Sequence, residues 1–261
     1  MKRSASILLF LFYCLLVSSQ EIIYLDENMT NITSKQFDEK CTNSVLKCLK
    51  FKTDSLTIHK VVYKYNFGKV DNLLYSQIKN QFAEKTNRNI HDNAVLLVRY
   101  RDSLFDFKTR NKNHLRHLKQ HKSAKHVDFN KLKFQKSREK WIQKQQKCRK
   151  KMQKINAETF YVFKYDFGAS EQYPTIDWIK DNGLFKKEFF KILYNNNFLI
   201  LKPTGEYFLS GAHLSNTFLK KLIKNEDWNS FKDDWQKSYQ SKSDRGYGVF
   251  KTSFYHKKHC F

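Results

Sequence analysis

Glycine and proline are scarce in this sequence, with seven Gly and two Pro among 261 residues. These two residue types form many of the sharp loops on which active sites are built. The chain also contains no glycine-rich phosphate-binding loop, no Gly-x-Ser-x-Gly nucleophile elbow and no His-Glu-x-x-His zinc-protease helix. These absences argue against the enzyme classes that such motifs define.

Acidic residues are also few, since 25 Asp and Glu face 49 Lys and Arg and give a formal net charge of +24. Such a balance favours acidic partners, such as nucleic acid, anionic lipid or acidic glycans. The abundance of Lys, Asn, Phe, Tyr and Ile also fits a drift of codons toward A and T. The charge alone is therefore a weak functional signal, although Glu, which also has A-rich codons, remains scarce.

The longest apolar run is too short to cross a bilayer, because Ile7–Val17 contains only eleven residues. Two basic residues precede this run, and the small residues Val17 and Ser19 follow the spacing that signal peptidase recognises. We therefore predict a secretory signal peptide over residues 1–19, with a membrane anchor as the alternative. Its removal lowers the formal charge from +24 to +22 and leaves a protein that is secreted or periplasmic.

Four cysteines follow the predicted signal peptide, and an even number in an exported chain favours disulfides over free thiols. Three pairings are possible. We favour Cys41 with Cys48, which are close in sequence, and Cys148 with Cys260, which joins the middle of the chain to its tail. In the alternative, Cys260 returns to the N-terminal pair.

One strand-like phrase is written twice, as "VYKYNFG" at 62–68 and "VFKYDFG" at 162–168. Both copies are rich in β-branched and aromatic residues, which favour strands. After the first copy we expect a helix capped by Asn72, then strands at 94–100 and 104–109 joined by a tight turn. After the second we expect a helical region over 177–194, then strands at 198–203 and 207–210, then a helix capped by Asn216.

The sequence thus predicts an α/β protein, with α+β as the alternative, made of two tandem β-α-β-β-α units. The expected division is a signal peptide over 1–19, an N-terminal unit over 20–110, a basic helical insert over 111–157 and a C-terminal unit with its tail over 158–261. Before the first copy, we expect a short strand from Ile22 and a helix from Ser34 to about Cys48. Thr33 and Gln36 form its capping box. A last strand is expected at 249–261.

The stretch "FLILKPTGEYFLSGAHLSNTFLKKLI" resembles the final β-β-α of thioredoxin-like domains, in which an apolar strand, a turn, a second strand, a Gly and a helix follow in order. This resemblance covers about half of the mature chain and implies a thioredoxin-like topology. The chain has no Cys-x-x-Cys, and Asn195–Asn197 stand where the family places a proline before the strand pair. The resemblance therefore does not imply thiol redox chemistry.

The segment between the copies is strongly basic, with 17 Lys or Arg against two acids over residues 110–154. Trp141, Gln145, Cys148, Met152 and Ile155 alternate spacings of four and three, which predicts a helix with a narrow apolar stripe. We expect two helices joined near 127–129. One interpretation is an anion-binding face for nucleic acid, lipopolysaccharide or acidic polysaccharide. The other is a solvated helical connector.

Two further groups of residues could form sites. His114, His117 and His121 share one expected helical face, with His126 beyond it, and three imidazoles can hold Zn²⁺ or Cu²⁺. The alternative for them is an exposed polar face. His256, His259 and Cys260 suggest a similar but weaker cluster, because a disulfide would remove the thiol.

The tail aromatics Trp228, Phe231 and Trp235 could bind sugar rings or a partner, but aromatic residues at helical spacing more often form core.

From these patterns we expect an exported, non-catalytic binding or interaction protein of the cell envelope or extracellular space. We expect no catalytic residue, cofactor or metal. The partner is left open, with an anionic surface or polymer at residues 110–154 as one candidate. The alternatives are a degenerate thioredoxin-like or other secreted enzyme, and an anion binder that uses the basic insert. Asn28 and Asn31 begin glycosylation sequons, which matter only in a eukaryotic secretory pathway.

Overall fold

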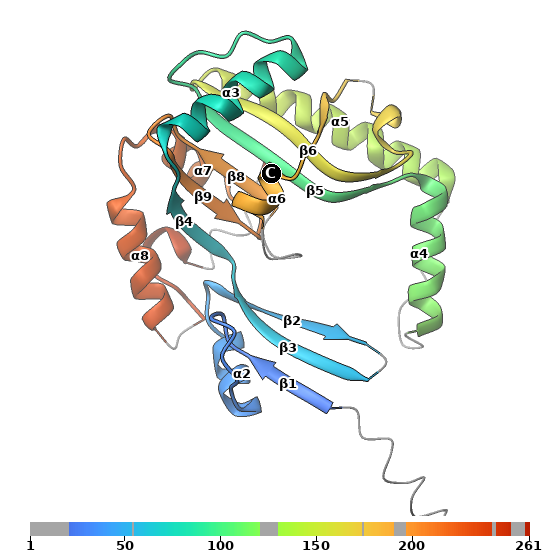
Figure 1. Cartoon of the computed structure of the whole chain (residues 1–261), viewed down its shortest axis with the longest axis vertical. Helices are drawn as coiled ribbons and strands as arrows, with labels where there is room; N and C mark the ends of the chain where they lie inside the picture. The colour runs from blue at the N-terminus through green and yellow to red at the C-terminus, as the bar shows by residue number, and fades with distance from the viewer. Residues whose placement is uncertain are drawn as a thin grey trace, which may run out of the picture.

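A computed structural model describes residues 21–53, 55–120, 130–173, 175–190, 197–241, 244–251 and 259–261 of the protein. The predicted signal peptide lies outside these residues. The helices and strands (Figure 1) occur in the following order: β1 Glu21–Leu25, α2 Ser34–Cys41, β2 Leu46–Lys52, β3 Leu56–Tyr63, β4 Tyr65–Lys69, α3 Asn72–Thr86, β5 Val95–Phe105, α4 Phe107–Gln120, α5 Lys131–Gln153, β6 Ala157–Phe167, η1 Ser170–Gln172, β7 Trp178–Lys180, α6 Leu184–Glu188, β8 Phe198–Leu201, β9 Glu206–Ser210, α7 Asn216–Lys224, α8 Asn229–Gln240 and η2 Gly248–Phe250.

The strands form two sheets, which confirms the expected α/β class. A small sheet has the order β1-β3-β2, and a large sheet has the order β4-β9-β8-β5-β6-β7. In the large sheet β5, β6 and β7 are parallel, whereas β8, β9 and β4 are added by antiparallel pairing. The parallel pair β5–β6 is joined by α4 and α5, as parallel strands require a crossover connection.

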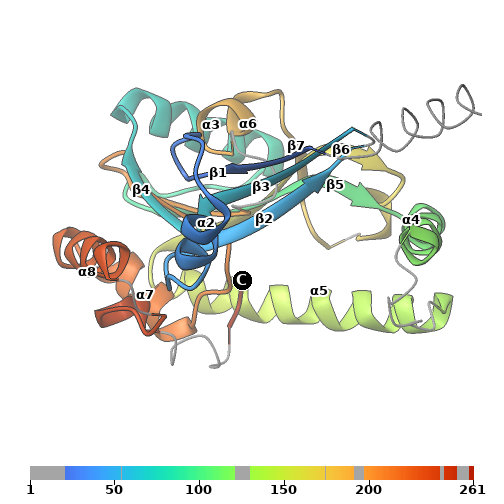
Figure 2. The ribbon, with the colours of Figure 1, turned by 90° about the horizontal axis from the view of Figure 1, so that it is seen from below.

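Helices cover both faces of the large sheet (Figure 2). On one face, Ile78 and Phe82 of α3 and Phe185 of α6 pack against Leu96 and Val98 of β5. On the other face the side chains of α5, α7 and α8 meet alternate residues of the same strands. Because successive side chains of β5 point to opposite faces of the sheet, this strand contributes residues to both cores.

The first copy of the repeated phrase is divided between the two sheets. Val62 and Tyr63 end β3 in the small sheet, while residues 65–68 lie in β4 at the edge of the large one. Between them, the Lys64 amide donates to the Val45 carbonyl, and the Lys64 carbonyl accepts from the Gly211 amide. The expected single strand is therefore wrong, because the backbone of Lys64 bonds to both sheets.

The second copy lies in the single strand β6, which pairs in parallel with β5 and β7. The two copies thus occupy different positions in the large sheet. Strands from both sides of the basic insert share this sheet, so the expected residue boundaries do not separate one sheet from the other.

Several expected boundaries also differ. The tight turn at 101–103 is wrong, because β5 continues from Val95 to Phe105 beside β6. The helix from Ser34 ends at Cys41 rather than near Cys48, since residues 46–52 pair with β3 as a strand. The region 177–194 begins with the strand β7 instead of a helix, because it pairs with β6.

Two helix caps also differ by one residue, since Asp71 and Ser215 cap α3 and α7 with their side chains. The capping box of Thr33 and Gln36 is confirmed. The strand pair at 198–210, with its turn, is confirmed as β8 and β9, and α7 follows them in the expected order. Residues 248–250 form the short helix η2, and most of the expected last strand lies outside the described residues.

Two disulfides are present, and they are the pairing that the sequence favoured. Cys41 is bonded to Cys48, which ties the end of α2 to β2, and Cys148 is bonded to Cys260, which ties α5 to the C-terminal residues. In the described part of the chain, no helix has the length and apolar character needed to cross a membrane.

Candidate anion-binding pocket

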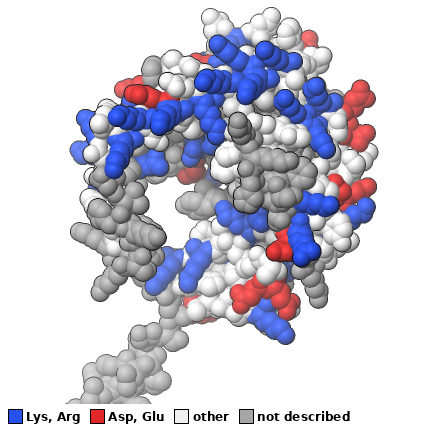
Figure 3. All heavy atoms as spheres, turned by 180° about the vertical axis from the view of Figure 1, so that it is seen from behind, with Lys and Arg blue, Asp and Glu red and all other residues white. Residues whose placement is uncertain are grey.

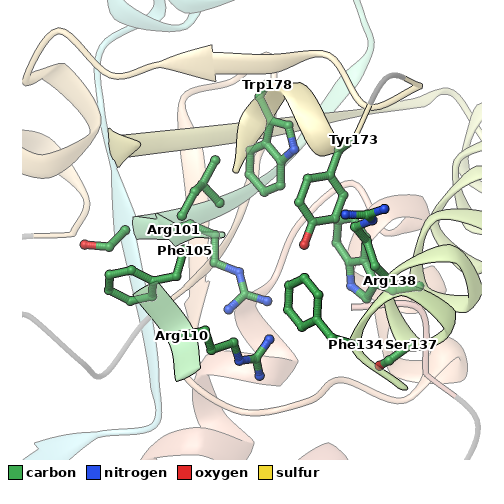
Figure 4. Close-up of a pocket in the computed structure, with 11 residues that line it drawn as sticks. Arg101, Phe105, Arg110, Phe134, Ser137, Arg138, Tyr173 and Trp178 are labelled. Atoms are coloured by element: carbon green, nitrogen blue, oxygen red, sulfur yellow. The ribbon is translucent and has the colours of Figure 1, made fainter. Parts of the chain in front are cut away.

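A cavity of about 440 Å³ lies where β5 ends, under the N-terminal half of α5 (Figure 4). Ligands of open α/β sheets commonly bind outside the carboxyl ends of the parallel strands. Four segments contribute to its wall, namely β5, the first turn of α4, α5 and the stretch from η1 to β7. The lining residues are Arg101, Ser103, Leu104, Phe105, Arg110, Phe134, Ser137, Arg138, Trp141, Tyr173 and Trp178.

Local sequence signals place these side chains. Alternation along β5 directs Arg101, Ser103 and Phe105 to one face of the strand. Asp106 then accepts from the Thr109 amide at 2.7 Å and starts α4, so that Arg110 follows one turn later. On α5 the lining residues recur at helical spacing, which places Phe134, Ser137, Arg138 and Trp141 on one side of the helix.

Three guanidinium groups give the pocket its charge. Figure 4 shows Arg101 and Arg110 projecting into the space between Phe105 and Phe134. Arg138 donates to the Gln172 side-chain oxygen at 2.8 Å, a neutral partner. The described residues that line the cavity include no Asp or Glu. Within the same described part, no ion pair involves any of these three arginines.

Arg101 and Arg110 both remain exposed to solvent, and they lie close enough for their positive charges to repel each other. Desolvation lowers the pKa of Arg101, Tyr173 opposes this shift, and the positive charge of Arg110 adds to it. Behind the pocket, burial lowers the pKa of Arg99 to about 10, and its guanidinium lies 5.9 Å from the centre of the Trp141 ring. Because like charges repel in a partly desolvated space, an anion bound there would relieve an existing electrostatic cost.

Aromatic rings form the remaining wall. Trp141 and Trp178 lie with their planes 7° apart at a centroid distance of 6.3 Å, and Tyr173 meets both edge-on at 5.6 and 6.0 Å. Arg110 and Arg138 lie 5.7 and 6.0 Å from the ring centres of Phe134 and Tyr173. Cation–π contacts of this kind hold guanidinium groups in place without neutralising them.

A second basic surface runs along the same helix. Lys140, Lys144, Lys147 and Lys151 line a cavity of about 490 Å³ next to the Cys148–Cys260 disulfide. Figure 3 shows Lys and Arg side chains gathered over the part of the surface where α5 lies. Desolvation and the nearby charge of Arg99 both lower the pKa of Lys144 on this surface.

The basic insert that the sequence singled out therefore contributes only part of the pocket. Arg110 and Arg138 come from residues 110–154, but Arg101 comes from β5, where a turn was expected. Tyr173 and Trp178 follow the insert and were missed as well. The sequence held one usable signal, since residues 95–105 contain neither Gly nor Pro, the residues that most often form a tight turn.

The expected histidine sites are not assembled by the described residues. His114 lies on α4, while the side chain of His117 and the residues His121 and His126 lie outside the described set. Cys260 is in a disulfide, and His256 is outside the described residues. In the part of the chain that is described, no group of three His, Cys, Asp or Glu could hold a metal ion.

The tail aromatics belong to the core. Trp228 is fully buried and its indole nitrogen donates to the Leu222 carbonyl at 2.9 Å, while Phe231 packs in the same cluster. Trp235 is partly buried against this cluster and stacks on Tyr239. These contacts support the structural interpretation of this stripe.

No family model matches the chain, and no curated protein or solved structure matches it either.

Proposed function

We propose that the protein is a non-catalytic binding protein that holds an anionic ligand in the pocket formed by Arg101, Arg110 and Arg138. One observation carries this proposal: three guanidinium groups share an aromatic-walled cavity whose described lining contains no carboxylate. Arginine presents a rigid fork of donors that matches carboxylate, sulfate and phosphate groups. Arg101 and Arg110 remain exposed to solvent, so an anion can reach both guanidinium groups.

The composition of the pocket favours binding over catalysis. Its described lining offers two serine hydroxyls, from Ser103 and Ser137, but no His, Cys, Asp or Glu that could serve as their general base. The alternative of a thioredoxin-like enzyme lacks its redox motif, since the close pair Cys41 and Cys48 is separated by seven positions. We expect no insulin reduction by the protein.

The two disulfides support the further proposal that the protein works in an oxidising compartment, in accord with the predicted signal peptide. Membership in the thioredoxin-like superfamily remains a prediction, supported by the order of β8, β9 and α7.

Calorimetric titration with tripolyphosphate, a small and flexible polyanion, tests the proposed function. Replacing Arg101, Arg110 or Arg138 by Gln should each weaken binding by about 1.5–3 kcal/mol, or about ten- to a hundredfold in Kd. Lys85→Gln is the matched control, because it removes one exposed positive charge from α3, on the other face of the sheet. Equal affinities for the Arg variants and the control would contradict the proposal.

A further inference from the structure

We infer that the anionic ligand is a single-stranded nucleic acid, whose phosphates bind the three pocket arginines while its bases stack on aromatic rings at the pocket mouth. This inference rests on the proposed anion-binding function and names the class of its ligand. Its observation is an aromatic ledge, defined as Phe105, Tyr165 and Phe167, at the carboxyl ends of β5 and β6.

The ledge is unusual in its exposure. Phe105, Tyr165 and Phe167 are 37%, 54% and 47% exposed. Phe105 and Phe167 are register partners and stack with ring centroids 5.2 Å apart. Single exposed aromatic side chains are ordinary on protein surfaces, but contiguous exposed rings mark an interaction site.

The ledge is continuous with the pocket. Phe105 is itself a lining residue, and Ser103, another lining residue, is the register partner of Tyr165. Alternation places Phe105 on the same face of β5 as Arg101, about 13 Å farther along the strand. A nucleic acid strand carries one phosphate per ~3.4 Å of duplex axis, so a few nucleotides cover this distance.

The combination of rings and arginines favours nucleic acid over an acidic glycan. Bases have flat π faces that stack on aromatic side chains, and this stacking tolerates any base sequence. The pocket uses arginine, which binds phosphate in a bidentate manner, although the insert around it is dominated by lysine. A sulfated glycan would be attracted to the Lys140–Lys151 face, but it would give the exposed rings of the ledge no comparable partner.

A longer strand can extend beyond the pocket. The lysines from Lys140 to Lys151 continue along α5 for about 17 Å, and Lys144 lies close enough to Arg99 for their charges to interact. Each further phosphate that meets a lysine releases counterions. We therefore expect the affinity to rise from four to twelve nucleotides, with a steeper salt dependence for the longer strand.

Fluorescence anisotropy with labelled dodecathymidylate tests this inference on the full mature chain. Three competitors separate the sources of affinity: a dodecameric abasic deoxyribose phosphate, a twelve-base-pair duplex, and a heparin dodecasaccharide. We expect the single strand to bind at least tenfold more tightly than the abasic chain, which has the same backbone charge but no bases. The duplex should bind less tightly as well, because its bases are already stacked on one another.

The ledge is then removed by the double substitution Phe105→Ala and Phe167→Ala. Binding of the single strand should weaken about tenfold or more, while tripolyphosphate affinity remains within twofold of the unmodified protein. Phe105→Leu with Phe167→Leu keeps the apolar volume and serves as a second variant should the alanines disturb folding. Tyr247→Ala, which removes another exposed ring, is the control.

The outcomes are distinct. Equal affinity for the abasic chain, or a ledge variant that binds the single strand unchanged, would overturn the nucleic acid inference. If heparin bound more tightly than the single strand, and the ledge variant bound heparin unchanged, the ligand would be a glycan. The proposed anion-binding function would then remain intact. If the unmodified protein bound neither tripolyphosphate nor the oligonucleotide, both the proposed function and the nucleic acid inference would be overturned.

Discussion

The closing glycines of the two repeated phrases are required for different reasons. A Cβ atom on Gly68 would lie 2.2 Å from the ring of Tyr207, the register partner of Gly68 in β9. Gly168 has open space around it but adopts a φ of +76°, a conformation that side chains disfavour. The same residue in the same phrase thus serves close strand contact in one copy and a left-handed turn in the other.

Glu27 is a buried carboxylate that connects three segments. It accepts two hydrogen bonds from Lys40 of α2, at 2.7 and 2.9 Å, and a third from the Tyr239 hydroxyl of α8. Burial of Glu27 raises its pKa, but the hydrogen bonds from Lys40 and Tyr239 act in the opposite direction. The net result is a pKa below 4.5. The ionised form is therefore the one that the folded protein favours.

Replacing Glu27 by Gln should lower the free energy of unfolding by about 1–3 kcal/mol at pH 7, because Lys40 and Tyr239 then share one neutral amide oxygen in place of a carboxylate with two. Since the pKa of Glu27 is lower in the folded state, its stabilising contribution is complete above the unfolded pKa, about 4.5. It is lost as the pH falls through the folded pKa.

Urea denaturation of both proteins between pH 7 and pH 3 measures this difference, which should be constant above pH ~5 and shrink below it. A difference that grows as the pH falls would contradict the assigned direction of the pKa shift.

At the scale of elements, β5 and α5 together define the site. In the first half of β5, alternate side chains pack into the two cores on opposite faces of the sheet. In its second half, Arg101 and Phe105 line the pocket. The inner stripe of α5 was predicted correctly at Gln145, Cys148 and Met152, which are buried. Gln145 also accepts from the Tyr161 hydroxyl at 3.1 Å. This hydrogen bond links the buried face of α5 to β6.

The Cys148–Cys260 disulfide should stabilise the protein more than Cys41–Cys48, because their sequence separations are 112 and 7 residues. In the chain-entropy description, loops of these lengths correspond to about 5 and about 2 kcal/mol. The double variants Cys148→Ala with Cys260→Ala and Cys41→Ala with Cys48→Ala act as each other's controls in non-reducing urea denaturation. A larger loss from the short loop would show that the tail contributes little to holding α5.

At the scale of the whole molecule, neither half of the chain can complete the large sheet, although the small sheet lies entirely within the first half. β4 is paired only with β9 among the described strands of the large sheet, and β5 lies between β6 and β8. These pairings connect residues on opposite sides of the basic insert.

A fragment of residues 20–110 should therefore fail to unfold cooperatively, because β4 and β5 lose every strand partner that the large sheet gives them. Circular dichroism in the near ultraviolet and thermal unfolding measure this. Co-expression with residues 111–261 is the control, since it restores the missing strands. Cooperative unfolding of the first fragment alone would support the tandem-unit architecture that the sequence suggested.

Local interactions explain why many elements could be predicted. The capping box of Thr33 and Gln36, the apolar spacing of α3 and the turn between β8 and β9 each depend on residues close together in the chain. Pairing across the sheet depends on distant residues, and two similar strands can satisfy their backbone groups in different neighbourhoods. For this reason the local pattern of "VYKYNFG" predicts one strand equivalent to "VFKYDFG", although the structure divides it at Lys64 between two sheets.

By itself the sequence determined the α/β class, the favoured disulfide pairs and a basic, apolar-striped helix in the second part of the insert, because local spacing and composition encode these features. Only the tertiary structure decided the candidate site. Arg101, Arg110 and Arg138 meet because β5 continues past the expected turn and α5 crosses over its end. That convergence depends on long-range strand pairing, which no local pattern specifies.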